Sequence, residues 1–181
     1  MVRGAAWLDG GRTVMAREFP MAILGLFSST PAVQVGDKAP DFALPDGSGK
    51  LVRLADFQGK KAVVLYFYPK DDTPGCTKES CSFRDQYQDF QAAGAEVIGV
   101  SSDSSESHKK FASKHSLPFI LLSDQGGAVR KKYGVPATLG LLPGRVTFVI
   151  DKQGVVRHTF NSQFKATQHV SEAIEALRGL H

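Results

Sequence analysis

The sequence predicts an α/β fold with a mixed central sheet and helices on both faces, and three observations support this prediction. From residue 33 onward the apolar pattern alternates between strand-like and helix-like periods. Residues 61–68 form a continuous apolar run, which is typical of a central strand buried on both faces. A chain of 181 residues, of which 42% are hydrophobic and 22% charged, can bury one hydrophobic core. We therefore expect a single domain over residues 33–181.

The first expected elements are strands. Residues 42–44 and 50–54 flank a Pro-Asp-Gly-Ser-Gly turn and should form an entry hairpin. The central strand over residues 61–68 follows and ends at a proline-bearing loop. The sequence contains no internal repeat.

Residues 74–93 are predicted to form the first long helix. Thr73 suits the N-cap, Pro74 the first helical position and Gly94 the stop. Cys76 then lies in the first turn, where unpaired backbone N–H groups and the positive end of the helix dipole point outward. Thiols at helix N-termini tend to ionise, and the thiolate is the nucleophile. The residue pattern alone therefore indicates a reactive cysteine.

The remaining elements follow from periodicity and breakers. They are a strand at 96–101, a helix at 105–115, a strand at 119–122, a short helix at 128–133, and a hairpin of 145–150 with 155–159. The Gly- and Pro-rich residues 134–140 are expected to be loop. The last helix begins near Thr167 and carries an apolar face of Val170, Ala173, Ile174 and Leu177. With a cysteine between a core strand and the next helix, this is a thioredoxin-like arrangement.

Composition excludes several classes of function. The net charge of +4 is spread without a basic block, so nucleic-acid binding is not expected. Two cysteines are too few for a disulfide scaffold or a four-sulfur zinc site, and no histidine pair lies beside them at ligand spacing, so we expect no metal. No stretch approaches the roughly 18 apolar residues of a membrane helix.

Residues 1–32 differ from the rest of the chain. They mix Gly, Arg and small residues, and they contribute only +1 of the net charge of +4. Their apolar run is too short for a secretory signal. We interpret them as a leader or extension, either the remnant of an organelle targeting segment or an added sequence, outside the fold.

The loop after the central strand reads Pro-Lys-Asp-Asp-Thr-Pro-Gly-Cys from Pro69 to Cys76. This P-x-x-x-T-P-x-C run resembles the active-site loop of the peroxiredoxins, thiol peroxidases with a thioredoxin-like fold. Cys81, five residues after Cys76, resembles the second reactive cysteine of the peroxiredoxin Q or bacterioferritin comigratory subfamily. The resemblance covers nearly all of residues 33–181, including segments 35–42, 118–124 and 143–151.

The resemblance implies a role for each site residue. Cys76 would be the peroxidatic cysteine and Cys81 the resolving one. The Thr73 hydroxyl would hold peroxide and thiolate in line, Pro74 would shield the thiolate from water, and Arg145 would stabilise developing negative charge. These roles make physical sense, because fixed donors aimed at the departing oxygen lower the barrier to O–O cleavage, and arginine keeps its charge.

A Cys76–Cys81 disulfide requires motion. The sulfenic acid formed on Cys76 would condense with the Cys81 thiol before further oxidation inactivates it. Residues five apart on an ideal helix have Cα atoms about 8.6 Å apart, whereas a disulfide tolerates at most about 7 Å. We therefore expect the start of the helix to unwind when the bond forms and to refold on reduction.

The implied activity is the reduction of hydrogen peroxide and alkyl hydroperoxides, with thioredoxin or a related dithiol protein as reductant and no bound cofactor. We expect a monomer, because one chain supplies both cysteines. Three alternatives stay open: a thiol-disulfide oxidoreductase, although its usual spacing is C-x-x-C, a peroxide-responsive redox sensor, and a non-catalytic binding domain. The pattern over residues 33–181 is similar to plant and algal members, so a chloroplast is expected, with bacterial cytoplasm as the alternative.

Other residues near the motif have less specific interpretations. Arg84 is expected to pair with a carboxylate such as Asp85, and Glu79 either accepts a proton or is solvated. The five histidines (His108, His115, His158, His169, His181) are expected on the solvated surface, and four aromatic residues (Phe42, Tyr66, Phe67, Phe148) in the core. Tyr68 and Phe83 are candidates for the wall of a peroxide pocket.

Overall fold

A computed structural model of the chain describes residues 32–138 and 142–180. The elements in chain order are β1 (Ala43–Pro45), β2 (Leu51–Arg53), the 3-10 turn η1 (Leu54–Phe57), β3 (Ala62–Phe67), α1 (Pro74–Asp85), α2 (Tyr87–Ala92), β4 (Ala95–Ser101), α3 (Ser105–His115), β5 (Ile120–Ser123), α4 (Ala128–Lys132), β6 (Ala137–Thr138), β7 (Leu142–Pro143), β8 (Val146–Ile150), β9 (Val156–Asn161) and α5 (Gln168–Arg178). The expected leader lies, except for Ala32, outside the described residues.

Five strands form the central sheet in the order β5-β4-β3-β8-β9. The β3 strand pairs in parallel with β4 and antiparallel with β8, which makes the sheet mixed, as predicted. Every residue of β3 and β4 is buried, in keeping with the continuous apolar run that predicted β3. Gly99 is required in β4, because a Cβ there would lie 2.7 Å from the Tyr66 ring and from Leu121.

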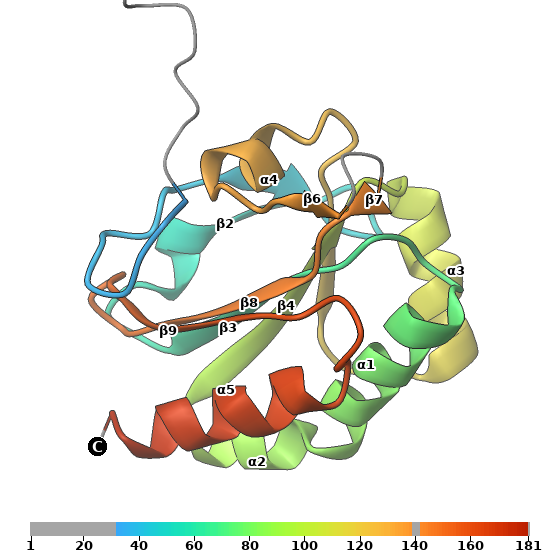
Figure 1. The fold of residues 1–181 in the computed structure, drawn as a ribbon. Helices are drawn as coiled ribbons and strands as arrows, with labels where there is room; N and C mark the ends of the chain where they lie inside the picture. Colours follow the sequence, from blue (N-terminus) through green and yellow to red (C-terminus); the bar gives the residue numbers. More distant parts are fainter. Residues whose placement is uncertain (1–31, 139–141, 181) are drawn as a thin grey trace, which may run out of the picture.

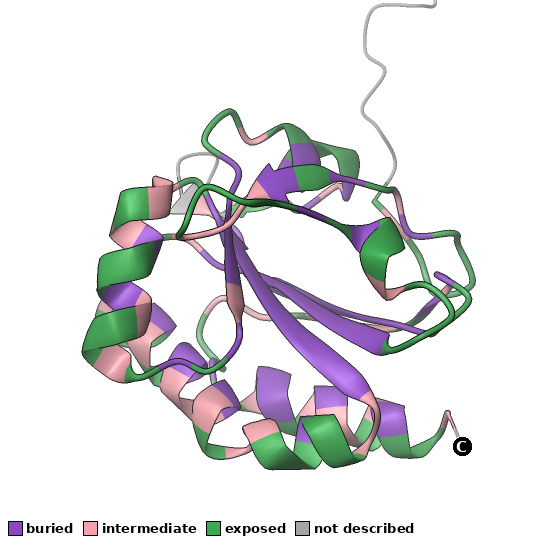
Figure 2. Cartoon of the chain, turned by 180° about the vertical axis from the view of Figure 1, so that it is seen from behind, coloured by how far each residue is buried: buried purple, intermediate pink, exposed green. Residues whose placement is uncertain are grey.

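Two layers cover the sheet (Figure 1). Helices α1, α2 and α5 lie on one face, where Tyr66, Phe83 and Val170 belong to one buried cluster. The β1–β2 hairpin, η1 and α4 lie on the other face, over a second cluster that contains Phe67 and Phe148. Figure 2 shows buried residues along the central strands and on the inward sides of the helices. The predicted α/β architecture with helices on both faces is confirmed.

The prediction of one helix over residues 74–93 is wrong at Gln86, which separates α1 from α2. No glycine or proline marks this break in the sequence. Long-range contacts cause it: the Tyr87 hydroxyl donates to Glu96 Oε1 at 2.6 Å, and Phe90 is fully buried against the sheet. The predicted ends of the segment hold, with Pro74 at the start and Gly94 in a left-handed conformation (φ 66°) after α2.

The prediction that residues 134–140 are entirely loop is wrong at Ala137–Thr138, which pairs with Leu142–Pro143 as a two-residue ladder. Residues 139 and 140 lie outside the described residues. The chain then passes so close to itself that a Cβ at Gly144 would overlap the carbonyl oxygen of Pro136. This close approach brings the chain into β8 with Arg145 facing the interior.

None of the helices in the described ranges is long and apolar enough to cross a membrane.

Candidate active site

Cys76 is the third residue of α1, after Pro74 and Gly75, and its side chain is only 1% exposed. Thr73 occupies the N-cap position, and its carbonyl accepts the first helical bond from Thr77 N at 2.8 Å. The earlier N–H groups of the turn have no intrahelical acceptor. The sulfur therefore lies at the positive end of the helix, as the sequence predicted.

Arg145, directly before β8, brings a cation to the sulfur. Its Nη2 donates to Cys76 Sγ at 3.2 Å, its Nη1 donates to Glu79 Oε2, and its Nε donates to Gln163 O at 3.3 Å. The side chain is only 3% exposed, so water does not screen this charge. A permanently charged donor at this position stabilises negative charge that develops beside it.

Glu79 is fully buried, so the interpretation that it is solvated is wrong. Burial raises the pKa of Glu79 to about 8, although the charge and hydrogen bond of Arg145 act in the opposite direction. Its Oε1 has no hydrogen-bond partner among the described residues and lies 3.7 Å from His169 Nδ1. The carboxyl group thus depends on Arg145 for its stabilisation.

His169 on α5 is neutral and does not supply a second positive charge. Its Nε2 faces the Ser162 carbonyl at 2.9 Å, so that nitrogen carries the proton and Nδ1 accepts from the Thr147 hydroxyl at 2.8 Å. Burial lowers the pKa of His169 to about 4, and the charge of Arg145 lowers it further.

Arg130 on α4 is a second buried guanidinium, which the sequence analysis missed. It donates to the Tyr68 carbonyl at 2.6 Å and to the Gly144 carbonyl at 2.7 Å, and it lies over the Phe67 ring. Burial lowers its pKa to about 10, against the opposing charges of Asp124 and Cys76. Arg130 ties the end of β3 to the residue that precedes Arg145.

Thr73 and Pro74 occupy the predicted N-cap and first helical positions. The Thr73 hydroxyl makes no capping bond and instead donates to Lys70 O at 3.1 Å. Pro74 is exposed at the helix start. The hydroxyl therefore lies on the loop side of α1.

Cys81 lies on the same uninterrupted helix as Cys76, is partly buried, and is free, as is Cys76. Residues at this spacing on an ideal helix have Cα atoms about 8.6 Å apart, beyond disulfide range. The structure therefore corresponds to the dithiol form. Arg84, next along this face, donates to Asp85 and to the His115 carbonyl, in agreement with its predicted structural role.

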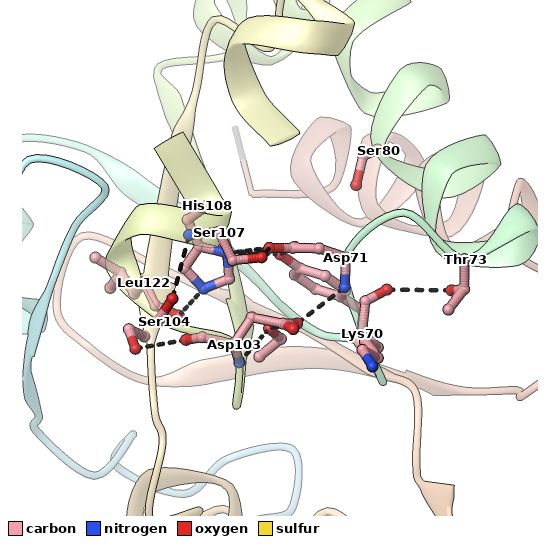
Figure 3. A network of polar contacts seen from close by, with 12 residues as sticks. Lys70, Asp71, Thr73, Ser80, Asp103, Ser104, Ser107, His108 and Leu122 are labelled. Atoms are coloured by element: carbon pink, nitrogen blue, oxygen red, sulfur yellow. Dashed lines mark hydrogen bonds and ion pairs between the residues drawn. The ribbon is translucent and has the colours of Figure 1, made fainter. Parts of the chain in front are cut away.

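The loop between β3 and α1 is held by buried polar side chains (Figure 3). Asp71 is 6% exposed and meets His108 of α3, which is fully buried, so the prediction of solvated histidines is wrong for His108 and for His169. His115 and His158 are partly exposed, and His181 lies outside the described residues. Helical spacing in the sequence could have indicated their burial, because His108 is one turn from Phe111 and His169 shares a helix face with Ala173 and Leu177.

The remaining aromatic predictions concern the core. Phe42, Tyr66, Phe67 and Phe148 are buried, as predicted. Tyr68 and Phe83 are also fully buried and share one cluster with Cys76; their role in a peroxide pocket stays a prediction. No group of three or more His, Cys, Asp or Glu side chains within residues 32–138 and 142–180 is placed to hold a metal ion.

Comparison with known proteins identifies the family. The family model described as AhpC/TSA family matches residues 35–159. A chloroplastic peroxiredoxin Q of Sedum lineare is 53% identical over 162 residues, which are 89% of this chain and 87% of the relative. A chloroplastic peroxiredoxin Q of Arabidopsis thaliana is 56% identical over 147 residues, 81% of this chain and 68% of the relative.

Solved structures give the same result. The crystal structure of peroxidoxin BcpB from Mycobacterium tuberculosis superposes with a TM-score of 0.77 at 39% identity, covering 82% of this chain and 99% of that one. A Xanthomonas campestris peroxiredoxin Q structure gives a TM-score of 0.73 at 30% identity, covering 81% and 96%. The chain therefore belongs to the AhpC/TSA family and, within it, to the peroxiredoxins of the Q or bacterioferritin comigratory type. Its fold is that of thioredoxin, and its activity is that of a thiol peroxidase.

Proposed function

We propose that the chain reduces hydrogen peroxide and alkyl hydroperoxides through a Cys76 sulfenic acid and a Cys76–Cys81 disulfide, which thioredoxin or a related dithiol protein reduces. The observation that carries this proposal is the Arg145 guanidinium 3.2 Å from Cys76 Sγ at the start of α1. A buried thiol held by a fixed cation at a helix N-terminus is suited to nucleophilic attack.

In the first step the Cys76 thiolate attacks one peroxide oxygen. The S–O bond forms as the O–O bond breaks, and the departing alkoxide or hydroxide takes one proton to become alcohol or water. Arg145 and the first-turn N–H groups face the charge that develops on these oxygens, and stabilisation of this kind acts mainly in the transition state. Thr73 is proposed to align the peroxide, and Pro74 to limit the access of water to the sulfur.

In the second step Cys81 attacks the sulfenic sulfur, the disulfide forms, and water leaves. Because α1 is continuous through both cysteines, this step requires the helix to unwind between them. A dithiol reductant then restores both thiols and takes up the disulfide. A nearby resolving thiol protects the enzyme, because it reacts with the sulfenic acid before peroxide oxidises the sulfur further.

The test is to mix reduced protein with one equivalent of hydrogen peroxide and to follow peroxide and free thiols. Wild type should consume the peroxide and lose both thiols, Cys76→Ser should be inert, and Cys81→Ser should consume peroxide and stop at the sulfenic acid. Equal slow reaction of wild type and Cys76→Ser would refute the mechanism and favour disulfide exchange or binding. Oxidation of wild type without turnover by a dithiol reductant would indicate a sensor.

We also propose a chloroplast location and a monomeric state, with residues 1–32 as a leader outside the domain at 33–181. The plant relatives carry the word chloroplastic in their names, and one chain supplies both cysteines. Fusion of residues 1–32 to a fluorescent protein tests the location, and sedimentation tests the monomer.

A further inference from the structure

The β3–α1 loop, which delivers the thiol-bearing helix, is fixed by a side-chain network outside the thiol site (Figure 3). Asp72 has a left-handed backbone conformation (φ 55°), which Asp tolerates better than most residues. Consecutive carboxylates therefore point in opposite directions. Asp72 is exposed and meets Lys114 at 2.7 Å, while Asp71 is buried.

Asp71 is an ionised carboxylate with three side-chain donors. It accepts from the Tyr68 hydroxyl at 2.7 Å, the Ser107 hydroxyl at 2.7 Å and His108 Nδ1 at 3.0 Å. Burial alone would raise the pKa of Asp71, but these bonds and the charge of His108 outweigh it and lower the pKa below its ordinary value.

His108 lies between this carboxylate and β5. Its Nδ1 faces Asp71, and its Nε2 faces the Leu122 carbonyl at 3.1 Å. The Asp71 carboxylate and the Leu122 carbonyl both accept hydrogen bonds, so each ring nitrogen of His108 has a fixed partner, and the Tyr68 hydroxyl lies 3.4 Å from Nδ1. The His108 and Asp71 side chains are 0% and 3% exposed, so neither has solvent as an alternative partner.

The network joins the loop to three other elements. His108 and Ser107 belong to α3, and Leu122 belongs to β5. The Asp71 backbone N–H donates to Asp103 Oδ2 at 2.9 Å, just beyond β4. Two residues after Asp71 comes Thr73, the N-cap of the helix that carries Cys76. The position of the thiol against Arg145 therefore depends on where this loop is held.

We propose that Asp71 and His108 are positioning residues of the peroxidase: their buried contact holds the β3–α1 loop while Cys76 reacts with peroxide, and it stays formed when α1 unwinds. This inference rests on the proposed thiol cycle. The hydrogen bonds of the pair go to Tyr68, Ser107 and Leu122 and not to either cysteine, so the pair acts on the reaction through the placement of Thr73 and the first turn.

The first test replaces His108 with glutamine. The matched control is His158→Gln, which removes another histidine–carboxylate pair, His158–Glu172, also at 3.0 Å but on the β9–α5 side. Rapid mixing with hydrogen peroxide and thiol trapping give two rates, for sulfenic acid formation and for the following disulfide. Because small misplacements of reacting groups cost up to about 100-fold, we expect His108→Gln to slow the first step about 10- to 100-fold.

The rate of disulfide formation distinguishes a positioning role from a general disruption of the structure. Cys81 attacks within the unwound segment, so the disulfide step of His108→Gln should stay within about 2-fold of wild type, and His158→Gln should leave both steps unchanged. Slowing of both steps by the same factor, or of neither, would overturn the proposal. A wild type that does not consume peroxide would instead refute the proposed function.

A measurement on the unaltered chain covers the case in which His108→Gln does not fold. Hydrogen exchange is followed for reduced and oxidised wild type. The Asp71 amide should stay protected in both forms, while amides within residues 77–82 lose protection on oxidation. Loss of protection at Asp71 on oxidation would overturn the proposal.

Discussion

Replacement of Arg145 by methionine should affect catalysis and stability through separate groups. The substitution removes the donor 3.2 Å from Cys76 Sγ. Loss of one donor that faces developing charge typically lowers rates about 100- to 1,000-fold, and we expect this range for the reaction with hydrogen peroxide. The same substitution leaves Glu79 buried without its counter-ion.

The cost in stability should depend on pH. Burial raises the pKa of Glu79, and Arg145 acts against that rise, so the pKa is higher still in Arg145→Met. A carboxyl group with a folded-state pKa above its unfolded value loses its stabilising contribution as pH rises through the folded pKa. Removal of one partner of a buried ion pair costs about 3–5 kcal/mol at most. Relative to wild type, we expect Arg145→Met to lose less free energy of unfolding near pH 5 than near pH 8.

Urea unfolding of the reduced protein at several pH values measures this effect, and competition with a reference peroxidase measures the rate. The double variant Arg145→Met with Glu79→Gln carries no buried charge at either position. It should recover most of the stability at alkaline pH while its rate stays low. Recovery of the rate in the double variant, or a loss of stability that does not change with pH, would refute this reasoning.

Three further predictions concern the surroundings of the site. Gly144→Ala should lower the free energy of unfolding by about 1–3 kcal/mol, because the added methyl overlaps the Pro136 carbonyl, and thermal melts would show it. His169→Gln should remove one step of acid destabilisation: the lowered pKa of about 4 means that stability is lost as pH falls from about 6.5 to 4, which urea titrations would detect. Arg130→Met should cost about 1–3 kcal/mol for each carbonyl left without a donor, and it should slow the peroxide reaction less than Arg145→Met does.

Features with a local cause were predictable from the sequence. The apolar run of β3, the proline that opens α1, and the apolar spacing of α5 each depend on residues close together in the chain. The cysteine-bearing loop was identifiable for the same reason, because Thr73, Pro74 and Cys76 lie within one turn of one another.

Features with a distant cause were not predictable. Glu79 lies on the same buried helix face as Cys76 and Phe83, yet its partner Arg145 is 66 residues away. His108 meets Asp71 across 37 residues. The break at Gln86 depends on a contact with β4 rather than on any residue at the break itself. In each case the tertiary fold supplies the partner that a single sequence does not reveal.

The buried face of α1 consists of Cys76, Glu79, Ser80 and Phe83, so that only one large apolar side chain anchors the helix to the sheet. Exposure of such a face forfeits little hydrophobic free energy, and water solvates the polar groups that it releases. The composition of this face therefore favours local unwinding of α1. In the proposed cycle, an apolar residue at position 80 would stabilise the packed helix and so slow the formation of the Cys76–Cys81 disulfide, a gain in stability at the expense of turnover.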